Sequence, residues 1–301
     1  MKKLLIVCGL ALLSTGAFAQ LGDFRIGAGV GVGTTGIDID VSATYGEYLG
    51  ARFGVDIMPK FKIDKNIDLD TKGAQANFDQ MTAKANQINT AAGRTVIDLS
   101  NPIFNNRLPD RMEVQGKLKN TTWHLLFDVY PFGARSSFHA TVGAYFGPSE
   151  IISVYNKEDG FLKPVCQWNE AVNNPDPSYA ALIAGQKMIQ AKLGDYWLAP
   201  NPAQNGNVEA YAKVNSFRPY LGIGFGRAVP KKRIGCQFDL GVQFWGKPEV
   251  YVPTYNEATG TYQTEKIDAD HAGDDAGKVL KTISKISVYP VLNFRLVGRI
   301  L

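Results

Sequence analysis

Residues 217–245 read FRPYLGIGFGRAVPKKRIGCQFDLGVQFW. Apolar residues occupy every second position from Phe217 to Phe225, whereas polar residues and glycines occupy the positions between them. The second arm, 234–244, repeats this alternation after a basic turn at 229–232. A period of two indicates a β-strand, and a strand of roughly 9–11 residues with one apolar and one polar face is typical of a membrane-spanning barrel. The stretch therefore predicts a transmembrane β-hairpin.

Composition and charge place only broad limits on the fold and on the kinds of partner. The chain has 301 residues, of which 45% are hydrophobic and 20% charged. This length suits two soluble domains or one barrel with large loops, and a barrel gives a weak hydropathy signal because its polar face is inside. The net charge of +4 is small and dispersed, so we expect no nucleic-acid partner.

The N-terminus has the pattern of an export signal. Two lysines precede an apolar run at 4–13, and a small-x-small sequence ends at Ala19, directly before Gln20. This pattern predicts a Sec signal peptide at 1–19, cleaved between Ala19 and Gln20, and a mature chain 20–301 in the outer membrane of a Gram-negative cell. No later run approaches the roughly 18 apolar residues of a membrane helix.

Eight segments share the alternation of the hairpin, which favours a closed barrel. Besides the two arms of the hairpin, they are 24–33, 37–45, 49–61, 115–130, 137–153 and 283–300. Short turns (46–48, 131–136, 229–232) alternate with a tight turn at 34–36 and with long segments at 62–114, 154–207 and 252–282. Short turns at one end and long loops at the other are typical of bacterial outer-membrane barrels. We therefore predict an all-β fold, an eight-stranded antiparallel up-and-down transmembrane barrel with long extracellular loops.

Two helices are expected within these loops, at 74–91 and 177–193. They either pack on one another above the barrel or form a cap that binds a partner or ligand. The first interpretation is favoured, because helices in long connections commonly serve to order them.

The polar strand faces carry a set of charged residues that should share one lumen. Its members are Arg25, Asp38, Asp40, Arg52, Asp56, Asp128, Arg218, Asp239 and Arg295. Side chains nearly fill an eight-stranded barrel, so these acids and bases are expected to pair with one another. The set forms either a salt-bridged plug or a narrow ion path, and the plug is favoured.

The three histidines do not form a recognisable catalytic set. Ser137 and His139 share a strand face beside a short turn, with no acid nearby in the sequence to orient the histidine. A nucleophile, its base and an orienting group must all be within reach, so we predict no catalytic site. His124 is expected to join Asp128 in the lumen network.

An acidic run in the last loop raises the question of a metal. It comprises Asp268, Asp270, His271, Asp274 and Asp275. Its spacing does not match the twelve-residue calcium loop, so a solvated loop is expected, with weak divalent binding near lipopolysaccharide as the alternative. No metal or cofactor site is predicted.

Outward-facing aromatic residues should mark the two membrane interfaces. Near one rim they are Phe24, Phe138 and Phe225, and near the other Trp123, Phe217 and Phe244.

Three stretches carry a resemblance to a known family. They are RPYLGIGFG at 218–226, FDLGVQF at 238–244 and YPVLNFRL at 289–296. With them the chain resembles the Bacteroidetes-type outer membrane β-barrel protein family, related in architecture to OmpA-like and OmpW-like barrels. The resemblance covers the strands but not the long loops. It implies outer-membrane lipid, lipopolysaccharide and the barrel-assembly machinery as partners, although the family's last strand usually ends in an aromatic residue and this chain ends in Leu301.

We therefore expect an integral outer-membrane protein with a structural or surface-interaction role, whose filled lumen anchors loops that could bind an extracellular ligand. The alternative is a narrow channel or transporter for small solutes or ions. A lipid-modifying enzyme ranks third, and our prediction is that the protein is not an enzyme.

Overall fold

Eight antiparallel strands close into a barrel in the order β1-β16-β13-β12-β7-β6-β3-β2. The computed structural model describes residues 24–60, 62–68, 71–105, 107–193, 195–256 and 258–301. The barrel strands are β1 (Phe24–Gly33), β2 (Gly36–Tyr45), β3 (Leu49–Ile57), β6 (Thr122–Val129), β7 (Phe138–Phe146), β12 (Phe217–Phe225), β13 (Ile234–Phe244) and β16 (Val288–Arg299). The predicted eight-stranded barrel is confirmed. The predicted signal peptide, with Ala19 and Gln20, lies outside the described residues.

The two faces of each barrel strand differ as the alternation predicts. In β13 the side chain of Leu240 is 50% exposed on the exterior, whereas its neighbour Asp239 is 2% exposed in the lumen. Successive side chains of a strand point to opposite faces of the sheet, so one pattern sets both surfaces. Aromatic pairs lie on the exterior at both ends, with Phe138 packed on Phe225 at one end and Phe146 on Phe217 at the other.

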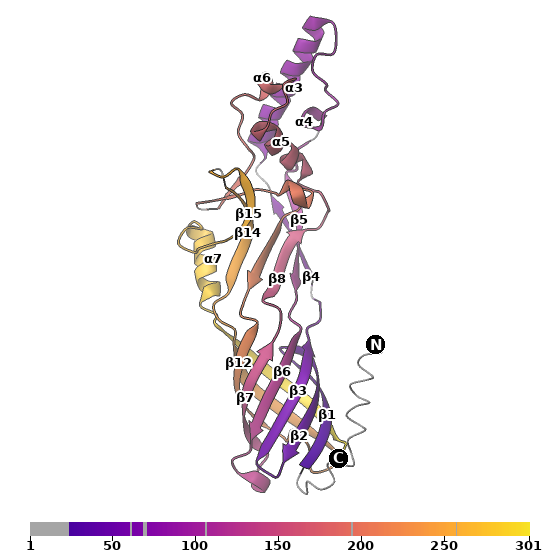
Figure 1. The fold of residues 1–301 in the computed structure, drawn as a ribbon, viewed down its shortest axis with the longest axis vertical. Coiled ribbons are helices and arrows are strands. Elements are labelled where there is room, and N and C mark those ends of the chain that lie inside the picture. The colour runs from indigo at the N-terminus through magenta and orange to yellow at the C-terminus, as the bar shows by residue number, and fades with distance from the viewer. Residues whose placement is uncertain (1–23, 61, 69–70, 106, 194, 257) are drawn as a thin grey trace.

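A second sheet extends the barrel beyond one end, which makes the molecule long and narrow (Figure 1). Its order is β4-β5-β8-β11-β14-β10-β9, with β15 paired to β14. Its strands are β4 (Lys62–Asp68), β5 (Arg111–Leu118), β8 (Glu150–Asn156), β9 (Ala191–Leu193), β10 (Tyr196–Leu198), β11 (Glu209–Lys213), β14 (Glu249–Asn256) and β15 (Thr261–Lys266). The sequence analysis did not predict this sheet within the long loops.

Several strands of the barrel are therefore shorter than predicted. The segment 115–130 contains the second half of β5 and all of β6, and 137–153 contains β7 and most of β8, with each pair divided between the two sheets. Pro148 lies in the second break, where its missing N–H cannot join a ladder. β3 ends at Ile57, shortly before Pro59, and β16 begins at Val288 because a helix occupies the residues up to Ser284.

The helices lie beyond or beside the second sheet (Figure 1). They are α3 (Lys72–Ala92), α4 (Pro102–Asn105), α5 (Lys163–Asn173), α6 (Ala180–Ile183) and α7 (Asp274–Ser284), with a 3-10 turn η2 (Pro202–Gln204). Another 3-10 turn, η1 (Gly133–Arg135), connects β6 to β7 at the opposite end of the barrel. α3 confirms the helix predicted at 74–91, and it ends at Gly93, whose φ of 60° favours glycine. No described helix has the length and apolar character needed to cross a membrane.

The helix predicted at 177–193 is wrong, because only the four residues of α6 are helical and β9 begins at Ala191. A buried asparagine explains the difference. Asn169 of α5 accepts a hydrogen bond from the Ile189 N–H at 2.6 Å and donates one to the Ile189 carbonyl at 2.9 Å. These bonds satisfy the backbone of Ile189 without a helix. Ile189 still packs beside a core of α3–α6 side chains that includes Phe78 and Trp168.

Candidate functional site: the polar lumen and the apolar cavity

The barrel places most of the predicted charged set inside its lumen. Eight members are at most 4% exposed: Asp38, Asp40, Arg52, Asp56, Asp128, Arg218, Asp239 and Arg295. Arg25 is the exception, since its side chain is 18% exposed. The eight buried residues all lie on strands of the barrel. Seven of them form three separate groups, and Arg218 stands apart from these.

The first group surrounds Arg52. Its guanidinium contacts both oxygens of Asp239 at 2.9 and 3.0 Å and one oxygen of Asp128 at 2.8 Å. The Thr141 hydroxyl donates a hydrogen bond to the same Asp128 oxygen at 2.7 Å, and His139 Nε2 lies 2.9 Å from Asp239. One arginine therefore forms ion pairs with two buried carboxylates.

The second group joins Arg295 to Asp40. The guanidinium contacts both carboxylate oxygens, and its Nη1 also donates to Gln237 Oε1 at 2.6 Å. β1 passes directly behind this pair, and a Cβ at Gly29 would come within 2.7 Å of both Arg295 Nη2 and Asp40 Oδ2. Because glycine has no Cβ, position 29 leaves space for this ion pair.

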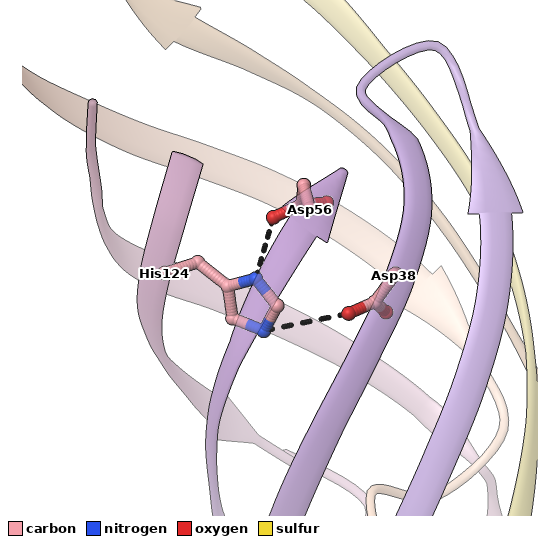
Figure 2. Close-up of side chains that lie close together, drawn as sticks. All are labelled: Asp38, Asp56 and His124. Carbon is pink, nitrogen blue, oxygen red and sulfur yellow. Dashed lines mark hydrogen bonds and ion pairs between the residues drawn. The ribbon is translucent and has the colours of Figure 1, made fainter. Parts of the chain in front are cut away.

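The third group lies around His124, where Asp38 and Asp56 approach the ring from neighbouring strands (Figure 2). His124 Nδ1 is 2.7 Å from Asp56 Oδ2, and Nε2 is 3.8 Å from Asp38 Oδ1. His124 therefore lies in the lumen network as expected, but its contacts are Asp56 and Asp38 and not Asp128. Residues four apart on one strand are separated by about 13 Å, whereas residues on adjacent strands can touch.

Two predicted lumen arginines bind groups outside the predicted set. Arg218 donates to Asn120 Oδ1 at 2.6 Å and to the carbonyls of Asn215 and Pro148 at 2.8 and 2.7 Å. Among the described residues, no carboxylate forms an ion pair with it. Arg25 lies at the opposite end and contacts Glu47 at 3.2 Å.

Sequence reasoning missed the partners of these arginines. Glu47 lies in a short turn and also pairs with Arg227 and Lys231, each at 3.0 Å. Asn120 lies in a break between strands. Glu47 lies outside the alternating segments, and Asn120 lies within the predicted segment 115–130 at a break that the alternation did not indicate.

Apolar and aromatic side chains occupy the remaining lumen near the second sheet. Leu126, Tyr145, Tyr220 and Val291 form a buried cluster. The rings of Tyr145 and Tyr220 lie 5.4 Å apart, and the His124 ring lies 5.5 Å from Tyr145. His124 and this apolar cluster thus lie side by side in the lumen.

The structure also shows the contacts of His139 and of the acidic run in the last loop. His139 Nδ1 lies 3.3 Å from the backbone carbonyl oxygen of Ser137, so the ring contacts the main chain of that residue. In the acidic run, Asp270 pairs with Lys281 at 2.7 Å, and His271 Nδ1 lies 2.9 Å from Asp195. The hydrogen bond to Asp195 raises the pKa of His271 above its ordinary value. The side chains of Asp274 and Asp275 lie outside the described parts.

A cavity of about 650 Å³ lies against the second sheet rather than in the barrel. Strands β5, β8, β11 and β14 and helix α5 line it, together with the segment around Leu198. Its wall is mainly apolar and includes Met112, Val154, Leu162 and Val252. No pattern in the sequence indicated this cavity, because its lining comes from three separate loops.

Comparisons with known proteins give little similarity in sequence. No family model matches the chain, and no curated protein matches it. Among solved structures, CarO2 of Acinetobacter baumannii is 14% identical with a TM-score of 0.41, and the match covers 91% of this chain and 98% of CarO2. CarO of the same organism is 14% identical, with a TM-score of 0.39 and coverage of 91% and 97%. A major outer membrane protein from Thermus thermophilus is 13% identical, with a TM-score of 0.36 and coverage of 92% and 98%.

These values are too low to transfer a fold or a function, so the architecture rests on the strand pairing described above. The resemblance to the Bacteroidetes-type family stays a prediction. What the chain itself establishes is a closed eight-stranded barrel with an apolar exterior and a polar lumen, extended at one end by a second sheet.

Proposed function

We propose that this protein is an integral outer-membrane barrel whose extracellular second sheet binds an apolar ligand in the cavity lined by β5, β8, β11, β14 and α5. The cavity carries the proposal. Its volume of about 650 Å³ falls within the roughly 300–1,000 Å³ typical of small-molecule sites, which are lined mainly by apolar side chains.

The exterior of the barrel supports a membrane location. Large apolar side chains such as Phe53, Leu221 and Leu240 are about half exposed there. A continuous apolar surface of this extent is unfavourable in water, and lipid hydrocarbon is its natural solvent. The predicted signal peptide directs the chain to export. By the usual rule of short periplasmic turns and long outer loops, the second sheet lies outside the cell.

The lumen supports an anchoring role over a conducting one. Arg52 and Arg295 are buried and paired with carboxylates, and aromatic side chains pack beside His124. The narrow channel remains the alternative. Planar-bilayer recordings of the refolded protein separate the two, since a plugged barrel shows no current steps, whereas steps altered by Asp239→Asn favour the channel.

Ligand binding is tested with N-phenyl-1-naphthylamine, an uncharged apolar fluorophore, and protein in lipid nanodiscs. Ala210 lines the cavity, whereas Ala212, two residues along the same strand, does not line it. We expect saturable fluorescence above that of empty nanodiscs for the wild type and for Ala212→Phe, and its loss in Ala210→Phe. Equal binding by both variants, or none by the folded wild type, refutes the proposal.

A further inference from the structure

The buried carboxylates of the barrel are unequally neutralised. Arg52 pairs with Asp128 and Asp239, and Arg295 pairs with Asp40. Among the described residues, Asp38 and Asp56 receive no ion pair from any lysine or arginine, and the basic side chain that contacts them is His124. Burying a carboxylate without a compensating cation is costly. These two carboxylates therefore lack the guanidinium contact that the other lumen carboxylates have.

Asp56 fixes the orientation of the His124 ring. Its Oδ2 lies 2.7 Å from Nδ1, while its Oδ1 accepts a hydrogen bond from the Thr35 hydroxyl at 2.7 Å. Both oxygens of Asp56 are thus engaged. A histidine whose Nδ1–H is held by a carboxylate presents the lone pair of Nε2, which is the usual arrangement behind a metal-ligating histidine.

Asp38 faces this nitrogen with a free oxygen (Figure 2). The residue is 2% exposed, and Asn293 holds its Oδ2 through a hydrogen bond of 3.1 Å. Its Oδ1 is buried and has no hydrogen-bond partner in the described part of the chain. It lies 3.8 Å from His124 Nε2, too far for a hydrogen bond.

A metal ion fits this gap. Bonds of about 2.0–2.2 Å to a nitrogen and an oxygen span 3.8 Å with an angle of about 130° at the metal, close to tetrahedral or trigonal geometry. An imidazole with carboxylates suits first-row divalent cations such as Zn²⁺. We propose that His124 Nε2 and Asp38 Oδ1 bind a divalent first-row transition-metal ion at the mouth of the barrel, with Asp56 as the positioning residue.

Two adjacent buried oxygens strengthen the assignment. Asn293 Oδ1 and Thr122 Oγ1 also have no hydrogen-bond partner among the described residues. Asn293 already holds Asp38, and Thr122 is the cross-strand neighbour of Asp56. The trio belongs to β2, β3 and β6, near the ends of these strands that face the second sheet. A bound ion would therefore link β2 to β6 directly, and β3 through Asp56, where the barrel joins the sheet.

A second histidine–carboxylate trio provides an internal contrast. Asp128, His139 and Asp239 also bring their ligand atoms within 4.8 Å of one another. There, however, the Arg52 guanidinium contacts both carboxylates, so a cation is already in place. We therefore assign the metal to the His124 trio alone, and this assignment does not depend on the proposed function.

The experiment uses the full mature chain, stripped with EDTA, refolded in detergent and titrated with Zn²⁺ by calorimetry. We expect one Zn²⁺ per chain for the wild type and loss of this binding in Asp38→Asn and His124→Gln. Asp56→Asn should bind about 10–100-fold more weakly, as expected for an outer partner of a metal ligand. The matched controls His139→Gln and His271→Gln, which remove the other two histidines, should bind as the wild type does.

Folding of each variant is checked by the change in electrophoretic mobility between unheated and boiled samples. Zinc X-ray absorption of the wild type keeps the test independent of the variants, and it should show an imidazole nitrogen among nitrogen and oxygen ligands. Any one of three results overturns the proposal: no Zn²⁺ uptake by folded wild type, an all-oxygen shell, or unchanged affinity in folded His124→Gln.

Discussion

Replacing Arg52 with methionine should strongly destabilise the barrel. The side chain is 3% exposed and forms ion pairs with Asp128 and Asp239, whose side chains are 0% and 3% exposed. Removing one partner of a buried ion pair costs about 3–5 kcal/mol, because the other charge is left buried and uncompensated. Two carboxylates lose their partner here, and only Asp239 keeps a neighbouring imidazole, from His139 at 2.9 Å. We therefore expect Arg52→Met to lower the free energy of unfolding by about 3–5 kcal/mol.

The measurement is urea unfolding of the protein in lipid vesicles, followed by tryptophan fluorescence and extrapolated linearly to zero urea. Arg25→Met is the matched control, because its partner Glu47 is 33% exposed and keeps Arg227 and Lys231. Loss of a partly exposed pair costs about 0–1 kcal/mol. Arg52→Lys should fall between the two, since lysine keeps the charge but lacks the planar fork that reaches both carboxylates. A free energy of unfolding for Arg52→Met within about 1 kcal/mol of that for Arg25→Met would refute the reasoning.

Three further predictions concern the exterior and the second sheet. Leu240→Arg should cost about 2–4 kcal/mol in the same unfolding assay and Ile234→Arg, at a strand end, about 0–1 kcal/mol; equal costs would contradict the placement of Leu240 near the membrane midplane and of Ile234 near its edge. The hydrogen bond from His271 to Asp195 stabilises the charged imidazole, so this contact holds below pH 6.5 and is lost as pH rises through the raised pKa of His271. An NMR titration should give a pKa above 6.5 that falls in Asp195→Asn, and an unchanged pKa would contradict the contact. Burial raises the pKa of the Cys166 thiol to about 11, so iodoacetamide at pH 8 should label this residue slowly in the folded protein and rapidly in urea.

The barrel could be predicted because its signal is local. Each strand has one lipid-facing and one lumen-facing side, and the pleat alternates them residue by residue. The burial of Asp239 beside the exposed Leu240 therefore follows from the order of residues in one segment. No knowledge of the neighbouring strands is needed, so the eight segments and most of the lumen residues were identified from the sequence.

The pairing of the lumen residues could not be predicted, because it depends on the register between strands. His124 and Asp128 share a face of β6, but along one strand they are about 13 Å apart. The actual partner, Asp56, is 68 residues away in sequence on β3. Side chains on adjacent strands approach to about 5 Å. A single sequence does not contain the register that brings them together.

The second sheet was missed for a different reason. Its strands are short, and β5 has the sequence RMEVQGKL, in which two consecutive residues are buried rather than alternate ones. The expected helix at 177–193 is not formed, because Asn169, from another segment, satisfies the backbone of Ile189 outside any helix. Tertiary contacts override local preference at both places.

Arg218 shows that depth in the barrel decides what a buried charge does. Arginines near the middle of the barrel bind carboxylates, but Arg218 lies where the barrel strands stop and the second sheet begins. Its guanidinium reaches Asn120, Pro148 and Asn215, which lie in three different connections between the two sheets. Where the chain passes from one sheet to the other, backbone carbonyls lose their hydrogen-bond partners in the sheet. The five N–H donors of a guanidinium can bind several such oxygens at once. The same residue type that neutralises the lumen therefore joins the barrel to the sheet above it, and its position along the strand decides which role it takes.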